Sequence, residues 1–222
     1  MRVLLPLCLL ALAVPAVAGD YTQTQEFTHL LSAGGRVYLK NEVGEVHVKA
    51  TDRKDVHIVV VKRARDSDQH SGPSRVAELR VEVSHSADEV RIRGTWPDRD
   101  MTHWMRGKSR LQIDYEVEIP RDARLQVDNE IGEVHITGAG NDVVVRNKIG
   151  EAYVDLAQSF QPRRVYLHTR IGEVQTGFPG RTTGLLGKKF TTILDGSHTL
   201  DVRVNIGEIR ISGGKLTKLT QL

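Results

Sequence analysis

Short stretches of alternating apolar and polar residues extend along most of the chain. In Leu111–Ile119 every second residue is apolar, and Pro120 follows directly. Such alternation predicts a β-strand with one buried face, and proline ends a strand because it cannot donate a backbone hydrogen bond. Three more stretches predict strands in the same way: Val56–Val61, Leu79–Val83 and Val90–Thr95. The polar segment Asp66–Arg75 predicts a surface loop, and no helical period longer than two turns is evident.

A second pattern repeats within the chain. Two alternating apolar positions lead to Asn, Thr or Val, then to Val or Ile, a Gly-Glu pair and an apolar-polar-apolar triplet. The five copies are VYLKNEVGEVHV from Val37, LQVDNEIGEVHI from Leu125, VVVRNKIGEAYV from Val143, VYLHTRIGEVQT from Val165 and LDVRVNIGEIRI from Leu200. Stacked copies would bury one continuous core. At one inward position Asn41, Asn129 and Asn147 recur, and we expect their amides to form a hydrogen-bonded ladder.

The parity of the apolar positions changes inside each copy. In the first copy the inward positions extend from Val37 to Val43, but Val46 and Val48, after Gly44, have the opposite parity. A flat strand would turn its second half outside in, so the pattern predicts a bulge or corner at Gly-Glu. Glycine reaches a positive φ without penalty and suits such a corner. The predicted corner glycines are Gly44, Gly132, Gly150, Gly172 and Gly207.

These patterns predict an all-β fold with a single domain, a β-solenoid or rolled sheet built from bent strands with Gly-Glu corners. The domain would cover residues 19–212, with a strand-rich front half to about residue 124, repeated rungs over 125–212 and a polar tail at 213–222. An extra loop, Gly177–Thr199, separates the last two copies.

The first residues have the pattern of a secretory leader. Arg2 supplies a positive start, an apolar run covers Val3–Val14, and Ala16-Val17-Ala18 resembles a signal peptidase site. We expect residues 1–18 to be removed and the protein to be exported, to the periplasm or the cell surface. The apolar run is too short to span a bilayer and no comparable run follows, so we expect no transmembrane anchor.

Composition removes several classes of function. The one cysteine, Cys8, lies in the predicted leader, which excludes a thiol nucleophile, a disulfide framework and a cysteine zinc site from the mature protein. The net charge of +3 is a small imbalance that does not indicate nucleic acid binding. No Gly-x-Ser-x-Gly elbow or phosphate-binding glycine loop is present. We therefore expect no catalytic residue, no cofactor and no metal.

The repeated acidic column raises a question of charge. In-register stacking would place its members about 4.8 Å apart, where like charges repel. Either a cation such as calcium bridges the carboxylates, or basic neighbours such as Arg146, Lys148, Arg170 and Arg203 neutralise them, and the absence of an Asp-rich calcium loop favours the second. The column consists of Glu45, Glu133, Glu151, Glu173 and Glu208.

Two further candidates are weaker. His47 and His135 share a repeat position that Tyr, Gln and Arg occupy elsewhere, which indicates a solvent-facing position rather than a metal site. The segment Gly94–Arg110 holds Trp96, Met101, Trp104 and Met105. It is either a partner-binding loop or a cap over an open end of the core, and we favour the cap. Asp98, Asp100 and His103 in the same loop have no geometric support as a metal or acid-base set.

The order of these features resembles a known family. The features are Phe27, Gly35–Val48, the strands of 56–95, Tyr115–Pro120, Leu125–Val127, the Gly-Glu-Val units and the closing stretch Gly196–Ile211. Over residues 26–212 they resemble the bacterial putative adhesin family of unknown function, also described as the toastrack domain. The resemblance implies a solenoid-like or rolled β fold, a cell-envelope location and a non-enzymatic role. Some members accompany membrane proteins in envelope-stress signalling, and the family offers no catalytic motif to transfer.

Three functions compete. The first is an exported structural or interaction (adhesin-like) module whose partner is an envelope protein or a surface glycan. The second is a carbohydrate-active β-helix enzyme, against which the aromatic content of 5% weighs. The third is a scaffold that self-associates through exposed strand edges.

Overall fold

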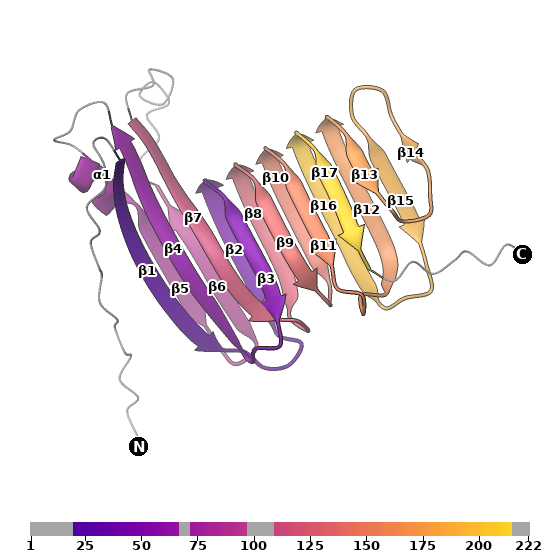
Figure 1. The fold of residues 1–222 in the computed structure, drawn as a ribbon, viewed down its shortest axis with the longest axis horizontal. Coiled ribbons are helices and arrows are strands. Elements are labelled where there is room, and N and C mark those ends of the chain that lie inside the picture. The colour runs from indigo at the N-terminus through magenta and orange to yellow at the C-terminus, as the bar shows by residue number, and fades with distance from the viewer. Residues whose placement is uncertain (1–19, 67–71, 97–108, 215–222) are drawn as a thin grey trace, which may run out of the picture.

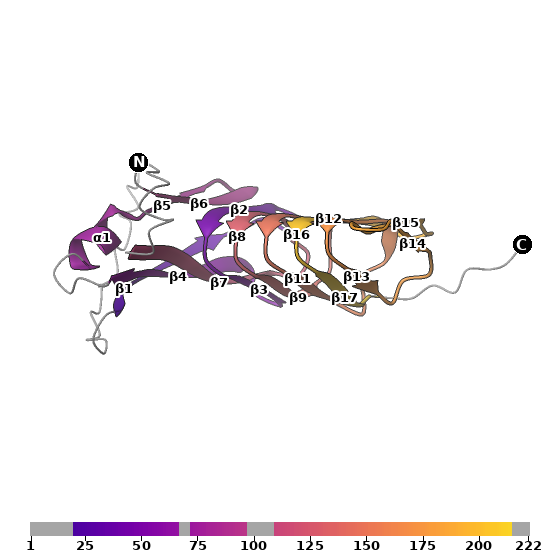
Figure 2. The same ribbon diagram turned by 90° about the horizontal axis from the view of Figure 1, so that it is seen from above.

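The computed structural model describes residues 20–66, 72–96 and 109–214, and the predicted all-β class is confirmed. Two mixed sheets lie face to face as layers, and neither closes on itself (Figure 2). In spatial order, the eight-stranded sheet contains β1 (Asp20–Leu30), β4 (Asp55–Asp66), β7 (Ser109–Pro120), β3 (Val46–Thr51), β9 (Val134–Ala139), β11 (Ala152–Leu156), β17 (Ile209–Gly213) and β13 (Val174–Thr176).

The nine-stranded sheet has its own order. It contains β14 (Thr182–Thr183), β15 (Lys189–Ile193), β12 (Pro162–Ile171), β16 (His198–Ile206), β10 (Val143–Ile149), β8 (Arg124–Ile131), β2 (Arg36–Val43), β6 (Glu89–Thr95) and β5 (Arg80–His85). The four strands predicted in the front half correspond to β4, β5, β6 and β7.

Each sequence copy forms one rung that joins the two sheets. Its first strand lies in the nine-stranded sheet, the Gly-Glu pair turns the chain, and its second strand lies in the eight-stranded sheet. The rungs are β2–β3, β8–β9, β10–β11, β16–β17 and β12–β13, and neighbouring rungs pair in parallel so that equivalent residues lie side by side (Figure 1). Backbone hydrogen bonds continue through the corner, for example from the amide of Gly132 to the carbonyl of Ile149 at 2.9 Å.

The spatial order of the rungs differs from their order in the sequence. The last copy, β16–β17, lies between β10–β11 and β12–β13 (Figure 1). The segment predicted as the loop Gly177–Thr199 contains β14 and β15, which pair antiparallel at the outer edge of β12, and the beginning of β16. After β12–β13 the chain therefore forms β14 and β15 on the outer side of β12, and then returns as β16–β17 between β12–β13 and β10–β11. A sequentially wound solenoid is not confirmed.

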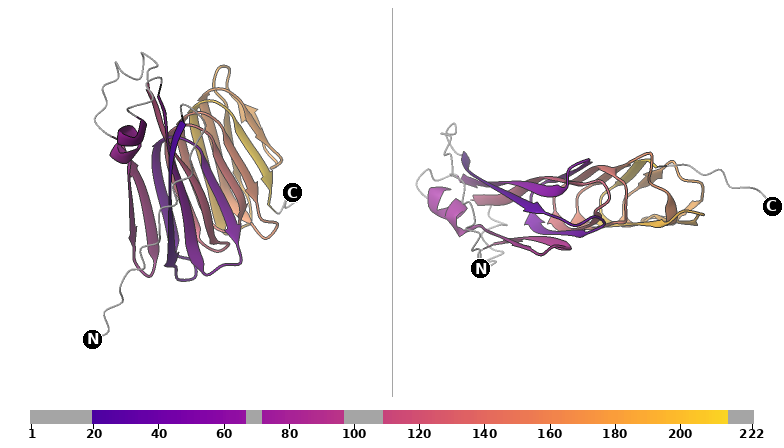
Figure 3. Two further views of the ribbon diagram at one scale, coloured as in Figure 1. Left: turned by 60° about the vertical axis from the view of Figure 1, so that its left-hand side comes forward. Right: turned by 90° about the horizontal axis from the view of Figure 1, so that it is seen from below.

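At the N-terminal end the pairing is antiparallel. β1 pairs with β4 and β4 with β7, while β5 pairs with β6 in the opposite sheet. The predicted loop Asp66–Arg75 overlaps helix α1 (Gly72–Glu78), which lies at this end of the two layers (Figure 3). Val76 of α1 and Leu79 after it are buried, and this apolar contact stabilises a helix too short to persist alone.

The core lies between the sheets and follows the predicted alternation, with one exception. The residue before each corner glycine was expected to face inward, yet Ile149, Ile171 and Ile206 are 46%, 52% and 46% exposed. The strand ends at this position and the chain turns toward the other sheet. The side chain therefore lies on the rim of the two layers rather than between them.

Candidate functional site: the corner column and the two outer faces

The corner glycines form a continuous column in which both backbone angle and space require glycine. Gly44, Gly132, Gly150, Gly172 and Gly207 have φ values between 127° and 140°, a region that favours glycine. A Cβ on Gly132 would collide with the carbonyl oxygen of Gly44, and a Cβ on Gly150 would collide with that of Gly132. The positive φ anticipated from the parity of the sequence is thus accompanied by a steric requirement that the sequence did not show.

Buried asparagines secure the corners. Asn147 donates through Nδ2 to the carbonyl of Gly132 at 2.8 Å, and Asn41 donates to the carbonyl of Ile113 at 3.2 Å. The expected amide ladder has one step, from Asn129 Nδ2 to Asn147 Oδ1 at 3.4 Å. In the last rung of the stack the hydroxyl of Thr169 donates to the carbonyl of Gly172 at 3.1 Å. These side chains mainly bond backbone carbonyls at the turn, which would otherwise be buried without a partner.

Four of the five column glutamates are contacted by a side chain of the same rung, and in one of these rungs the contact is a cation, Arg210. His47 contacts Glu45 at 3.2 Å, His135 contacts Glu133 at 2.8 Å, Arg210 contacts Glu208 at 2.8 Å and the hydroxyl of Tyr153 donates to Glu151. Glu173 has Lys188 at 3.8 Å instead. Three of the four basic residues expected in this role pair elsewhere, because Arg146 and Arg203 bond Asp201 and Lys148 bonds Glu130. Within the described ranges no cluster of metal-ligating side chains occurs.

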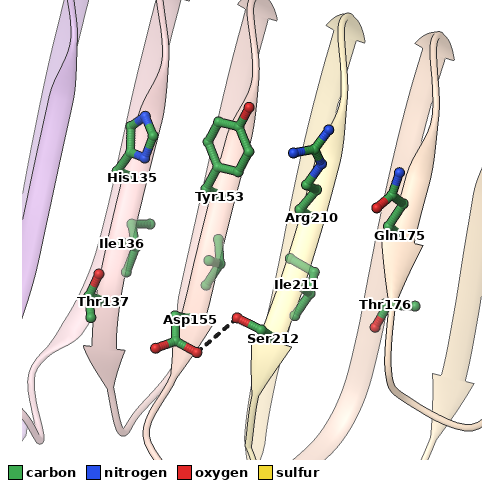
Figure 4. Close-up of a pocket in the computed structure, with 11 residues that line it drawn as sticks. His135, Ile136, Thr137, Tyr153, Asp155, Gln175, Thr176, Arg210, Ile211 and Ser212 are labelled. Carbon is green, nitrogen blue, oxygen red and sulfur yellow. Dashed lines mark hydrogen bonds between the residues drawn. The ribbon is translucent and has the colours of Figure 1, made fainter.

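The side chains that contact the column from within their own rung form a row on the outer face of the eight-stranded sheet, and Figure 4 shows His135, Tyr153 and Arg210 of this row. The rings of His47 and His135 stack at 4.7 Å with an interplanar angle of 1°, and His135 stacks on Tyr153 at 4.7 Å. The guanidinium of Arg210 lies 5.4 Å from the Tyr153 ring centre. The ring faces therefore cover one another and mainly their edges meet solvent. A sugar ring would stack poorly on such a row, since stacking needs an exposed aromatic face.

A shallow groove of about 540 Å³ follows the same face over β9, β11, β17 and β13. Its floor is polar as well as apolar, and Ser212 donates to Asp155 across it at 2.8 Å (Figure 4). The groove offers hydrogen-bonding groups to an extended partner.

The tryptophan-containing segment is described only in part. Trp96 is half-buried and packs against the core, and its ring lies beside Gly94, close to Tyr115. Met101, Trp104 and Met105 lie outside the described residues, as do Asp98, Asp100 and His103.

Sequence reasoning missed the outer face of the nine-stranded sheet. Strand alternation places many more basic than acidic side chains on it, although the net charge of the whole chain is only +3. The basic residues are Arg36, Lys40, Arg80, Arg91, Arg93, Arg124, Arg146, Lys148, Arg164, Arg170, Lys189 and Arg203, and the acidic ones are Glu42, Glu82, Glu89, Asp128, Glu130 and Asp201. Assigning each charged residue to the inner or outer face of its strand would have revealed this excess of basic side chains. That assignment requires knowing which strands form each sheet.

The outer face of the other sheet has the opposite balance. Among its described side chains the basic ones are Lys49, Arg63 and Arg210, and the acidic ones are Glu26, Asp55, Asp114, Glu116, Glu118 and Asp155. The two faces of one slab thus differ in charge.

Comparison with known proteins gives one distant likeness to report. No family model matches the chain, and no curated protein matches it significantly. A solved structure from Clostridium sporogenes, described as a putative cell adhesion protein, is 12% identical with a TM-score of 0.44 and covers 86% of this chain and 99% of its own. That similarity is too distant to transfer a function. In the part of the chain that the structure describes, no helix is long and apolar enough to cross a membrane.

Proposed function

We propose that this protein is an exported, non-enzymatic module of the cell envelope that acts by presenting its two outer faces to a partner. The observation that carries the proposal is the stacking of five rungs in register, which arranges equivalent side chains in rows on both faces. Backbone ladders through every corner hold these rows in place. A rigid face with ordered side chains loses little conformational entropy on binding.

Export is the first part of the proposal to test. Residues 1–18 lie outside the described residues, and the support for a leader is their sequence pattern. We expect the intact mass of the secreted or periplasmic protein to correspond to a chain that begins at Gly19. A protein that retains Met1 in its native host would contradict export.

Binding to the envelope is the second part. Mature protein, residues 19–222, would be mixed with cell-wall, outer-surface and membrane fractions and sedimented. We expect it to sediment with at least one fraction and to remain in solution without it. Recovery of the protein only in the supernatant, with every fraction, would overturn the proposal.

An enzyme remains the competing function, and the glutamate column decides between them. Glu133 occupies a position repeated in every rung and contacts His135, so a structural role explains it. We expect Glu133→Gln to leave any polysaccharide hydrolase or lyase activity unchanged. Loss of such an activity in a variant that still folds would favour the enzyme.

Self-association has a specific observation in its favour. Ile149, Ile206 and Ile171 form an exposed aliphatic row along the rim, and Leu186 follows Ile171 because its carbonyl accepts from the amide of Gly172 at 3.1 Å. If copies associate through this row, sedimentation velocity should show a concentration-dependent increase in mass that Ile149→Asp abolishes. A constant monomer mass would exclude the scaffold.

A further inference from the structure

Cations cross the outer face of the nine-stranded sheet in one line. Strand pairing places Arg93 beside Lys40, Lys40 beside Asp128, Asp128 beside Arg146, Arg146 beside Arg203, Arg203 beside His168 and His168 beside Lys189. We call this line the cationic row. It crosses seven strands, one residue from each, along the long axis of the molecule (Figure 1). Neighbouring positions are about 4.8 Å apart.

The cationic row is only partly neutralised. Asp201, one position away on β16, bonds Arg146 at 3.0 Å and Arg203 at 2.9 Å. Glu82 lies opposite Arg93 and Asp128 lies opposite Lys40 in the sheet register, yet within the described ranges neither pair, nor Lys189, forms an ion pair. Two register pairs of the row are like-charged, Lys40 with Arg93 and Arg146 with Arg203, and like charges directly opposite each other on paired strands destabilise a sheet. An external anion would therefore relieve a repulsion that the fold itself leaves.

Two tyrosines position the charged groups of the row. Tyr166 lies beneath both Arg203, whose guanidinium carbon is 4.8 Å from the ring centre, and Lys189, whose Nζ is at 5.6 Å. Tyr38 donates to Asp128 of the row at 2.8 Å, and its ring also lies 5.1 Å from the guanidinium carbon of Arg91, which is next to the row and not part of it. Cation–π contacts restrict these long side chains, so less entropy is lost when they bind an anion.

The shape of the row indicates what it binds. A small anion would contact only one or two of the cations, whereas a linear polymer can contact the whole row with one charged group per few ångströms. The row contains no exposed aliphatic side chain that would insert into a bilayer. Guanidinium groups bind carboxylate, sulfate and phosphate groups bidentately.

We propose that the outer face of the nine-stranded sheet binds a linear anionic polysaccharide laid across the strands along the cationic row. This inference rests on the proposed function, because it names the chemistry of the envelope partner. Lys40, Arg93 and Lys189 contact the acidic groups of the polymer, with Arg146 and Arg203 between them.

The test uses mature protein and three probes: dextran sulfate, polygalacturonate and uncharged dextran. We expect binding to both anionic polymers, none to dextran, and a steep loss of affinity as salt rises. The triple variant Lys40→Gln/Arg93→Gln/Lys189→Gln removes only cations that hold no ion pair, and we expect it to bind at least about tenfold more weakly. Thermal melts show whether each variant folds.

A control matched in net charge removes three cations away from the cationic row: Lys49 of β3, Arg210 of β17 and Lys54, which lies in the turn between β3 and β4. Lys49→Gln/Lys54→Gln/Arg210→Gln has the same net charge as the first triple variant, and we expect its affinity to stay within about twofold of the native value. An equal loss of affinity in both variants would mean that binding depends only on net charge, and it would overturn the inference. Absence of binding to both anionic polymers would overturn it as well. Binding to vesicles of anionic lipid but to neither polymer would also overturn it.

The two levels of the proposal fail separately. If the first triple variant still sediments fully with envelope fractions, the polysaccharide inference is wrong and the envelope role stands. If the native protein sediments with no fraction, the envelope role itself fails, whatever the polymers show.

Discussion

The rung stack and the N-terminal end are built on the same two sheets but satisfy their buried polar groups differently. In the rungs, the inward positions are almost all aliphatic, and the buried asparagines and Thr169 bond backbone or one another. At the N-terminal end the interior includes Lys62, the ring of His29 stacked on His85 at 4.1 Å, and the hydroxyl of Tyr115. Among described residues, the buried side-chain atoms without a hydrogen-bond partner include that hydroxyl, Gln25 Oε1 and His29 Nε2 at this end, but also Asn41 Oδ1 and Asn129 Oδ1 in the rungs.

The difference shows what repetition contributes to stability. In the stack, asparagine or threonine supports the turn in four of the five rungs, and each rung covers the next. The same type of side-chain hydrogen bond therefore satisfies the buried polar groups at successive turns. The N-terminal end has no equivalent neighbour, and each buried polar group there needs its own compensation. Substitutions in the stack should therefore be costly, whereas some at the N-terminal end should stabilise the protein.

The largest expected effect is at a corner of the stack. Gly150→Val combines a positive φ with a collision against the carbonyl of Gly132. We expect a loss of about 2–6 kcal/mol in the free energy of unfolding, from backbone strain and overpacking together. Denaturant melts measure it.

The matched control for that corner is Gly177→Val, at a glycine with no atom within 4 Å of an added Cβ and no positive φ. Its loss should stay below about 1 kcal/mol. If both glycine variants lost equally little, the corner would not be the feature that fixes the rung.

The next effect concerns the asparagine that supports two corners. Asn147→Val removes the bond to the carbonyl of Gly132 and the acceptor of Asn129, although Val204 at the equivalent position shows that valine fits. We expect a loss of about 1–3 kcal/mol, because a buried carbonyl is left unpaired. The exposed Asn205→Ala is the control, and an unchanged melting curve for Asn147→Val would mean that the backbone ladder alone secures the turn.

At the N-terminal end the expected change has the opposite sign. Burial lowers the pKa of Lys62, so the folded state carries a cost for its charge. Lys62→Met should raise the free energy of unfolding by about 0.5–2 kcal/mol at pH 7. As pH rises from the lowered pKa toward 10.5, the folded native protein loses the proton of Lys62 and becomes more stable. The difference in free energy of unfolding between Lys62→Met and the native protein, from denaturant melts, should therefore decrease over this pH range. A Lys62→Met variant less stable than the native protein at pH 7 would refute this account.

The smallest effect is a pH dependence from the stacked histidines. Burial, and then the neighbouring His85, lowers the pKa of His29 below 6.5. The unfolded chain therefore binds its proton first, and stability is complete above about pH 6.5 and falls as pH drops toward the lowered value. Urea melts at pH 7.5 and 5.5 should show a smaller difference for His29→Gln than for the native protein. An identical difference in both would exclude His29 as the cause.

Local patterns in the sequence determined the strands and the corners. Alternation indicated β4 to β7, and the parity change at Gly44 and its equivalents indicated the turn, because both depend on a few neighbouring residues. The pattern failed for β1, whose inward positions include Gln23, Gln25 and His29, so the strand lacks an apolar face. It also failed for α1, a helix stabilised by the tertiary burial of Val76.

Only the tertiary structure decided how the rungs are ordered and what their faces carry. Copies that resemble one another pair equally well in several orders, so the place of β16 between β10 and β12 is not encoded in the repeat itself. The cationic row joins residues as distant as Lys40 and Lys189, and its members become neighbours only once that order is set. Local sequence fixes which way each side chain points, whereas charge on a face is a property of the assembled sheet.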